Sequence, residues 1–449
     1  MSRVRLVACH ECDLLQRDVP VPPGGTLRCR RCHGQLYRNR TDSLERALAF
    51  TVASIVLFVI SNLYPIVGLS VSGTLVETTL AGAVRVLYED GMWPLAGLVF
   101  ATTILMPLVQ IAGMLWLLLP LRAKRVPARA ALVFRLCHLA EPWGMTEVLI
   151  LGLLVALVKL AHIASIVIGV ALYSFGALML VLAAARAAFD ARELWSRIGA
   201  MRGVAGEGMG EREGEGAGEG EGEGEGEGET HMRYPSGIVT AAECGLVLCH
   251  DCGLLAKVPG HAHDLACPRC GAALHVRKPA SVSRTWALLI AAIVLYLPAN
   301  VLPVMYTSSL FGAQTDTIMS GVVYLWISGS WPLAVVVFVA SVAVPMLKIL
   351  ALAYLAFTAQ RRSRWLPEQR TRIYRMVEFV GRWSMLDIYV ITMLVALVQF
   401  QALATIKAGP AAIAFGAVVV LTMFAAMTFD PRLIWDTAEH DHGRPRTEA

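Results

Sequence analysis

The chain has 449 residues, of which 56% are hydrophobic and 16% are charged, and its mean hydropathy is +0.59. Soluble domains carry about 25% charged residues, so this composition excludes an ordinary soluble protein and indicates a large lipid-facing surface. The formal net charge of +5 excludes no class of partner by itself, because an acidic segment offsets basic ones. We therefore expect an integral membrane protein.

Four cysteines lie near the start of the chain as two Cys-x-x-Cys pairs, Cys9 with Cys12 and Cys29 with Cys32. Two such pairs can place four thiolates around one tetrahedral Zn²⁺. The segment between them is polar and rich in proline and glycine, which suits short β-strands that fold around the metal. Thiolates reserved for a metal indicate a cytoplasmic location rather than a disulfide framework.

The following 150 residues contain apolar stretches for four membrane spans. The first covers residues 47–67, the second residues 93–119, and an apolar hairpin over residues 147–189 supplies the third and fourth. Each is long enough for a hydrocarbon core of about 30 Å. The connection between the second and third spans is basic and contains Arg122, Lys124, Arg125, Arg129 and Arg135.

An almost uninterrupted Glu-Gly repeat occupies residues 206–229. Such a segment has too few apolar side chains to form a core, and its like charges repel one another. The repeat therefore predicts a disordered linker between two halves of the chain.

The second half repeats the first, beginning with Cys249, Cys252, Cys267 and Cys270. Later motifs recur in the same order with an offset of 238 to 240 residues. The matching pairs are Asn62-x-x-Pro65 with Asn300-x-x-Pro303, Trp93-Pro94-Leu95 with Trp331-Pro332-Leu333, and Phe189-Asp190-x-Arg192-x-x-Trp195 with Phe429-Asp430-x-Arg432-x-x-Trp435. This ordered set of matches indicates a tandem duplication.

The predicted fold is an all-α polytopic membrane protein, in which a four-helix transmembrane unit is duplicated and each unit follows a small cytoplasmic zinc ribbon made of β-strands and four cysteines. The two units together have eight predicted spans. Basic residues crowd the middle loop of each unit, which places these loops, both ribbons, the linker and both termini in the cytoplasm. The expected divisions are residues 1–42 (ribbon 1), 43–199 (unit 1), 200–235 (disordered linker), 236–280 (ribbon 2), 281–440 (unit 2) and 441–449 (tail).

A cation, Lys348, lies far from either end of its predicted span. Placing it there costs about 2.5–3.5 kcal/mol unless it is paired or hydrated. Asp387 is the available carboxylate, and Ser341, Thr392 and Thr422 are expected at neighbouring depths. We interpret these five residues as a candidate polar network for transport. The alternative is that Lys348 extends toward the cytoplasm while the hydroxyl groups bond backbone carbonyls.

The first unit differs at these positions. Gln110 replaces Lys348 and Glu147 replaces Asp387, so the predicted charge pair is broken there. The two units are therefore expected to share a fold but not a role, with unit 2 as the working half.

The two four-cysteine sites predict two bound Zn²⁺ ions. Four thiolates leave no open position on the metal, so catalysis at the metal is not expected. The ribbons either stabilise the fold, or they recruit a partner or regulate the membrane part. An iron site with the same ligands is the alternative.

The chain resembles the paraquat-inducible protein A family. The resemblance rests on a four-cysteine ribbon followed by four spans, which occurs twice together with the motifs above. The resemblance covers nearly the whole chain apart from the Glu-Gly linker. It implies an inner-membrane protein of a diderm bacterium that works beside a partner whose MCE (mammalian cell entry) domains form a periplasmic tunnel for lipids. The implied function is to load lipids into that tunnel or extract them from it, without enzymatic activity.

The residues themselves are compatible with that implication. No Gly-rich phosphate loop occurs, so no ATPase motor is expected in this chain. Neither a nucleotide nor a nucleic acid is expected as a partner. Energy would then come from an ion gradient or from a partner, and the Lys348–Asp387 pair is the candidate for coupling protonation or conformational change to lipid loading. The alternative functions are a membrane redox or stress-response protein that uses the cysteine metal sites, and an autonomous channel.

Overall fold

The computed structural model describes most of the chain. The described residues are 6–71, 74–144, 146–160, 165–210, 239–257, 265–309, 312–329, 331–363, 365–381, 385–397, 399–400 and 404–436. The predicted tail, 441–449, and most of the predicted linker lie outside them.

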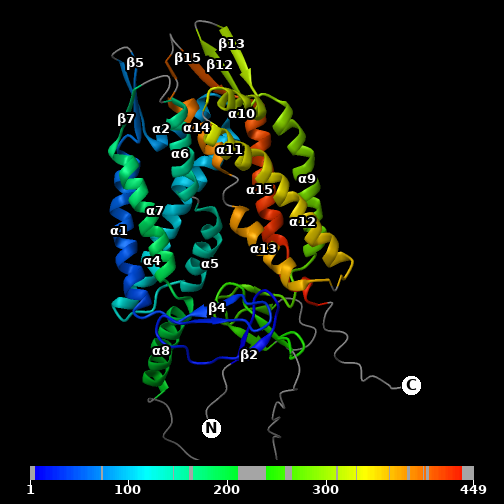
Figure 1. Ribbon diagram of the computed structural model, residues 1–449. Coiled ribbons are helices and arrows are strands. Elements are labelled where there is room, and N and C mark those ends of the chain that lie inside the picture. Colours follow the sequence, from blue (N-terminus) through cyan, green and yellow to red (C-terminus); the bar gives the residue numbers. More distant parts are fainter. Residues whose placement is uncertain are drawn as a thin grey trace, which may run out of the picture.

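Unit 1 contains the helices of the first repeat, and its second and third spans are each assembled from successive helical segments (Figure 1). The bounds are α1 Ser43–Leu63, α2 Leu80–Glu89, α3 Trp93–Phe100, the π-helix η1 Ala101–Leu105, α4 Met106–Arg122, α5 Ala130–Ala140, the 3-10 turn η2 Glu141–Trp143, α6 Thr146–Leu160, α7 Val170–Ala188 and α8 Ala191–Gly210. Helix α8 includes residues 200–210, which the sequence assigned to the linker.

Unit 2 repeats this order, including a π-helix at the equivalent place in its second span. The bounds are α9 Ser281–Val301, α10 Ile318–Ile327, α11 Trp331–Phe338, the π-helix η3 Val339–Ala343, α12 Val344–Gln360, α13 Pro367–Gly381, α14 Leu386–Leu397, α15 Pro410–Thr428 and the 3-10 turn η5 Pro431–Ile434.

Seven helical stretches of the described chain are long and apolar enough to cross a membrane. They are Ser43–Leu63, Trp93–Arg122, Ala130–Leu157, Val170–Ala188, Ser281–Val301, Ala334–Gln360 and Pro410–Thr428. The remaining predicted span corresponds to α13 and α14, between which residues 382–384 lie outside the described chain. The duplicated membrane fold is thus confirmed, and the count of eight spans stays a prediction.

The third span of each unit begins earlier than the sequence suggested. Helices α5 and α13 occupy much of the two segments expected to be basic loops. In unit 1 the span is interrupted by η2, where Pro142 supplies no backbone N–H for a continuous helix, and by Gly144. Basic content alone was therefore a poor guide to loop structure, because helices can carry basic side chains such as Arg135 in α5 and Arg372 and Arg375 in α13.

The loops at one end of the molecule form antiparallel sheets that the sequence analysis did not predict; we call this the sheet end. In unit 1 the strand order is β6-β5-β7, and in unit 2 it is β13-β12-β15-β14. The bounds are β5 Val67–Val71, β6 Thr74–Thr78, β7 Ser165–Ile168, β12 Met305–Ser309, β13 Gly312–Asp316, β14 Gln399–Phe400 and β15 Ala404–Ala408.

A glycine follows β7 and β15 where the chain passes the proline of the Asn-x-x-Pro motif. A Cβ on Gly169 would lie 2.1 Å from the carbonyl oxygen of Pro65, and one on Gly409 would lie 2.2 Å from that of Pro303. Only glycine fits such an approach of two backbones. The motif and a glycine more than 100 residues later therefore join the first and fourth spans in each unit.

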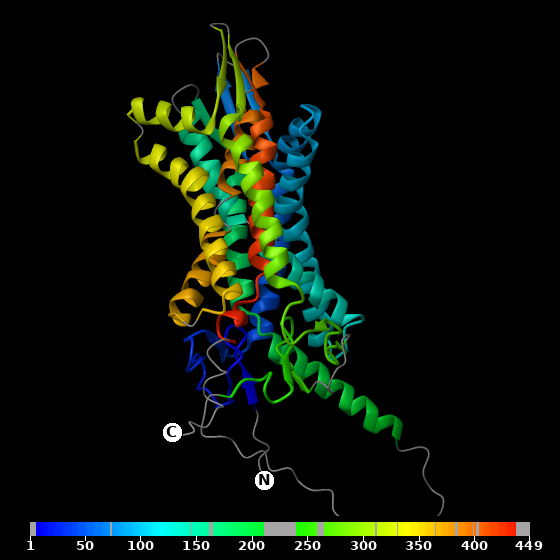
Figure 2. The ribbon, with the colours of Figure 1, turned by 90° about the vertical axis from the view of Figure 1, so that its right-hand side faces the viewer.

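The two ribbons lie together at the opposite end, which we call the ribbon end (Figures 1 and 2). Each ribbon consists of two antiparallel hairpins with a Cys-x-x-Cys pair at each turn. The strands are β1 Leu6–Ala8, β2 Leu15–Arg17, β3 Thr26–Arg28 and β4 Gln35–Arg38 in ribbon 1, and β8 Leu246–Leu248, β9 Leu255–Lys257, β10 Leu265–Ala266 and β11 Ala273–Leu274 in ribbon 2.

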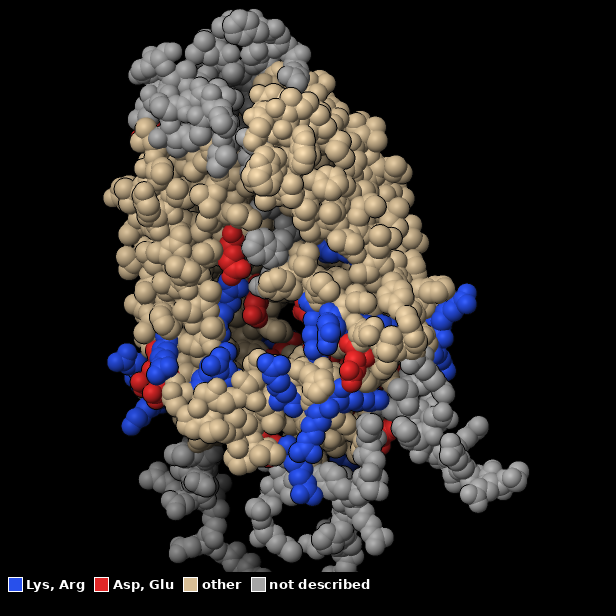
Figure 3. Space-filling model, viewed as in Figure 1, with Lys and Arg blue, Asp and Glu red and all other residues tan. Residues whose placement is uncertain are grey.

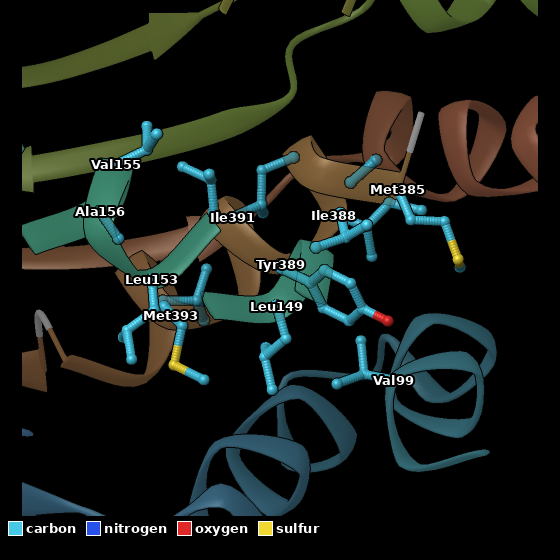
Figure 4. Close-up of a cluster of buried hydrophobic side chains, with 14 of the residues drawn as sticks. Val99, Leu149, Leu153, Val155, Ala156, Met385, Ile388, Tyr389, Ile391 and Met393 are labelled. Carbon is cyan, nitrogen blue, oxygen red and sulfur yellow. The ribbon is translucent and has the colours of Figure 1, made fainter. Parts of the chain in front are cut away.

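The two units meet mainly through their third spans. Helix α14 packs against α6 and α2, and Figure 4 shows the apolar side chains that fill this contact, including Leu149, Leu153 and Ile388. The buried hydroxyl of Tyr389 crosses the contact and donates to the hydroxyl of Thr102 in η1, at 3.0 Å. The units therefore share one core.

Each ribbon packs its apolar face against the unit of the other repeat. The cysteines of ribbon 1 share an apolar cluster with Leu355, Tyr374 and Trp435 of unit 2. Those of ribbon 2 share a cluster with Phe134 and Trp195 of unit 1. The ribbons also pair with each other, since the amide of Ala241 donates to the carbonyl of Asp13 at 2.9 Å, beside an antiparallel bridge between Leu14 and Thr240.

Replacing Arg375 by Ala should loosen ribbon 1 from unit 2. Arg375 on α13 binds both carboxylate oxygens of Glu11 and donates to the carbonyl of Cys32 at 2.8 Å. Hydrogen bonds to charged groups contribute about 1.5–3 kcal/mol, so we expect cleavage by trypsin within residues 6–38 to be about tenfold faster. Arg372→Ala, on the exposed face of the same helix, is the matched control. Equal protection of the two variants would contradict crossed docking.

Candidate metal centres and membrane-embedded polar residues

Cys9, Cys12, Cys29 and Cys32 converge on one point in ribbon 1. Their Sγ atoms all lie within 4.8 Å of one another, with 3.5 Å between Cys9 and Cys32 and 3.4 Å between Cys12 and Cys29. All four side chains are buried. A tetrahedral metal with metal–sulfur bonds of about 2.3 Å needs sulfur atoms about 3.8 Å apart, so this set fits a thiolate-bound ion such as Zn²⁺.

Cys249, Cys252, Cys267 and Cys270 form the same arrangement in ribbon 2. The Sγ distances are 3.5 Å between Cys249 and Cys270 and 3.6 Å between Cys252 and Cys267. Hydrogen bonding with the Cys252 thiol is the main cause that lowers the pKa of the Cys249 thiol to about 5. A thiolate is therefore available at neutral pH to begin metal binding.

The backbone of each Cys-x-x-Cys turn closes in the same way. The residue after the second cysteine has positive φ, which is 60° at Asp13, 59° at His33, 68° at Gly253 and 67° at Gly271. Its amide donates to the carbonyl of the first cysteine of the pair, at 2.8–3.0 Å. Ribbon 2 uses glycine at this left-handed position and ribbon 1 does not. In ribbon 1, Asp13 instead gains side-chain contacts with ribbon 2.

The Phe-Asp-x-Arg motif of unit 2 anchors the end of ribbon 2. The fully buried carboxylate of Asp430 accepts from the Lys278 amide at 3.0 Å and from the guanidinium of Arg432 at 3.0 and 3.1 Å. Burial raises the pKa of this carboxyl, but Arg432 outweighs burial and holds the pKa below its usual value. Trp435 completes the motif by donating to the hydroxyl of Thr371 at 2.9 Å. The motif thus has a structural role.

Lys348 is 2% exposed in the middle of its span. Its Nζ lies 3.5 Å from the position that a Cβ would take on Gly381, the last residue of α13. The end of a helix presents free carbonyls and a partial negative charge, which stabilises a cation. The break in the third span therefore supplies compensation for the charge of Lys348. The side chain of Asp387 lies outside the described residues.

The three predicted hydroxyl groups bond the backbone of their own helices. Ser341 donates to Val337 at 2.6 Å, Thr392 to Ile388 at 2.7 Å and Thr422 to Val419 at 2.9 Å. All three side chains are buried. The three hydroxyl groups therefore bond backbone carbonyls, as the alternative interpretation expects. The five-residue polar network for transport stays a prediction.

Gln110 of unit 1 corresponds to Lys348 of unit 2, and it contacts the end of α5, the helix that corresponds to α13. Its Nε2 donates to the carbonyl of Ala140, the last residue of α5, at 3.0 Å. A Cβ on Gly144 would lie 2.7 Å from the same nitrogen, so the glycine leaves room for the amide. Both units therefore place a donor from the second span at the break of the third.

Unit 1 also contains an ion pair that sequence reasoning missed. Arg186 on α7 approaches Glu147 on α6, with 4.0 Å between Nη2 and Oε1. Comparison of the aligned positions considered only Gln110, the residue of unit 1 that corresponds to Lys348. It therefore could not find a cation that unit 1 carries on another span. An arginine inside an apolar run, which Arg186 is, was the available signal.

An apolar cavity of about 40 Å³ lies in unit 2 below the sheet end. Ser341, which lies in the π-helix η3, is one of the residues that line the cavity. The cavity therefore adjoins an irregular part of the second span. Short π-helical segments within α-helices are frequent at functional sites. The lining residues are Val304, Met305, Thr317, Ile318, Gly321, Val337, Ser341, Val390, Ile391 and Phe415.

Comparisons with known proteins agree with this architecture. The model of the family described as paraquat-inducible protein A matches residues 44–199 and 282–439, one match per unit. The intermembrane transport protein PqiA of Escherichia coli K12 is 34% identical over 443 residues, which cover 97% of each chain. No solved structure matches significantly.

Two further relatives extend the comparison. The lipophilic envelope-spanning tunnel protein A of Escherichia coli K12 is 28% identical over 97% of this chain and 92% of its own length. A probable intermembrane transport protein of Haemophilus influenzae is 27% identical over 96% of both chains. Since the family model covers both units and the similarity to PqiA runs along the whole chain, this protein belongs to the paraquat-inducible protein A family.

Proposed function

We propose that the chain is the inner-membrane component of an MCE-type lipid transport system, which loads lipids into a periplasm-spanning tunnel partner or extracts them from it. The observation that carries this proposal is the end-to-end similarity to proteins named for intermembrane transport and for an envelope-spanning tunnel. None of these names describes an enzyme, which supports a role in transport rather than catalysis.

The orientation in this proposal has the ribbon end in the cytoplasm and the sheet end in the periplasm, with eight spans. The basic residues between the second and third spans support it, because cytoplasmic segments near membrane helices are rich in Lys and Arg. Those in the described part of the chain include Arg122, Lys124, Arg125, Arg129, Arg135, Arg361, Arg362, Arg370, Arg372 and Arg375. The sheet end then faces the tunnel partner.

In this proposal unit 2 is the working half. Its cavity below the sheet end is lined mainly by apolar side chains, which suits contact with acyl chains. Lys348 lies seven residues after Ser341 on the same span, deeper in the membrane. A cation that is held by a helix end can respond to a proton or to a movement of α13. We assign the coupling role to Lys348 with Asp387, Ser341, Thr392 and Thr422.

We assign Zn²⁺ to both four-cysteine sites, with a structural role. The sulfur spacing suits Zn²⁺, and the crossed docking gives each metal a position from which it can fix the opposite unit. Four buried thiolates around one ion leave no open ligand position, which argues against catalysis at the metal.

A photo-crosslinking residue in place of Tyr306 should capture a protein with MCE domains in intact cells. Tyr306 lies on β12 and is 40% exposed. The same residue in place of Trp365, which is 68% exposed toward the ribbon end, should not capture it. Capture at neither position, with the protein present at its normal level, would contradict a periplasmic tunnel partner at the sheet end.

Lys348→Ala should reduce the envelope barrier to the level of a strain lacking the protein, because the change removes the charge at the end of α13. Complementation of that strain measures the effect, with protein level checked by immunoblot. Lys257→Ala, an exposed lysine of β9 in ribbon 2, is the control and should complement fully. Full complementation by both Lys348→Ala and Asp387→Asn would contradict the coupling role assigned to these two residues.

Purified protein should contain about two Zn²⁺ per chain, and Cys9→Ser and Cys249→Ser should each lose about one. Because each metal holds a ribbon on the opposite unit, Cys9→Ser should also expose ribbon 1 to trypsin. Elemental analysis measures the metal. Stoichiometric, redox-active iron would instead favour the alternative function, a membrane redox or stress-response protein.

A further inference from the structure

An arginine and a glutamate of unit 1 meet within the membrane without forming a hydrogen bond. Glu147 lies in the first turn of α6 and Arg186 in the last turn of α7. The distance of 4.0 Å between Nη2 and Oε1 is longer than a charge-assisted hydrogen bond, which spans about 2.7–2.9 Å. The two groups attract one another, and each keeps its hydrogen-bonding atoms for a third group.

Arg186 lies toward the ribbon end of its span, and Glu147 lies just after the break in the third span. Helix α6 ends and helix α7 starts near the sheet end, and a rise of about 1.5 Å per residue puts the pair about 20–24 Å from it. This depth is close to the inner-leaflet boundary of a bilayer core of about 30 Å. Figure 3 shows a hollow between the two units in this part of the molecule, with acidic and basic side chains around it.

The polar atoms of the pair are only partly satisfied. The Nε of Arg186 is buried and has no hydrogen-bond partner within the described chain, while the side chains of Arg186 and Glu147 remain 23% and 42% exposed. The break in the third span does not account for Arg186, because Gln110 already donates to the carbonyl of Ala140. The guanidinium therefore keeps a donor that no group of the described chain accepts, on a side chain that is partly exposed.

We infer that Arg186 and Glu147 bind the headgroup of a phospholipid that carries a primary ammonium group. Arginine binds a phosphodiester well because its donors form a planar fork, and the carboxylate of Glu147 can accept hydrogen bonds from the ammonium. This inference rests on the proposed function, since it names the class of lipid that the chain carries, and it gives unit 1 a headgroup-binding role beside the coupling role of unit 2.

The same pair disfavours other headgroups. A headgroup with only negative charge meets the carboxylate of Glu147 without a compensating cation. A quaternary ammonium has no N–H with which to bond that carboxylate. In unit 2 the equivalent positions are Asp387 and Ala426, so this combination of an α6 carboxylate with an α7 cation is particular to unit 1.

The test is lipid binding to purified, delipidated full-length protein in detergent, measured by native mass spectrometry. The probes are phosphatidylethanolamine, phosphatidylcholine and phosphatidylglycerol with the same acyl chains. We expect wild-type protein to prefer phosphatidylethanolamine about tenfold over the other two. Glu147→Gln should abolish the preference over phosphatidylcholine, and Arg186→Gln should weaken binding of all three lipids about tenfold.

The matched controls are Arg85→Gln and Glu89→Gln, which alter an exposed ion pair of α2 with a 2.8 Å contact. They should leave lipid binding unchanged. Arg186→Lys keeps the charge and should retain part of the binding, which separates loss of the site from misfolding. Equal binding of the three lipids by wild-type protein, or an unchanged preference in Glu147→Gln, overturns the headgroup site.

The failure of this inference differs from failure of the proposed function. If the headgroup site is wrong but transport is right, wild-type protein still binds lipids, without headgroup preference, and still complements the envelope defect. If the proposed function is wrong, wild-type protein binds none of the lipids above the level of a detergent-only membrane protein control.

Discussion

The crossed docking of the two ribbons holds the two repeats in one arrangement. Ribbon 1 reaches unit 2 through Glu11 and Arg375, and ribbon 2 reaches unit 1 through an apolar cluster around Phe134. The buried cysteines of each ribbon lie in an apolar cluster that the opposite unit completes. Each four-cysteine cluster therefore contacts the repeat to which it does not belong.

The break in the third span explains where polar groups lie in the membrane. A broken helix leaves carbonyl groups without partners in a medium that supplies none, so nearby donors must satisfy them. Gln110 does this in unit 1, and Lys348 approaches the equivalent helix end in unit 2. Both units keep the break in the third span, but the side chain at the break is the neutral amide of Gln110 in one and the charged amine of Lys348 in the other. This difference allows one unit to acquire a different role.

The two units consequently differ more in chemistry than in shape. Unit 2 keeps its cation on the second span, and unit 1 has Arg186 on the fourth, beside Glu147. A comparison of aligned positions misses this change, because side chains from neighbouring helices can reach one point from different spans. The shared apolar contact of α14 with α6 and α2 then keeps both sets of polar groups in one body.

The sequence by itself determined the membrane class, the duplication and the two sets of four cysteines, because each rests on composition, order or spacing along the chain. Only the tertiary structure decided the strands of the sheet end, the broken third spans, the crossed ribbons and the pairing of Glu147 with Arg186. Those features depend on contacts between residues far apart in sequence, such as Gly169 with Pro65 and Arg375 with Glu11. No local pattern encodes such a contact, since packing between helices decides which side chains meet.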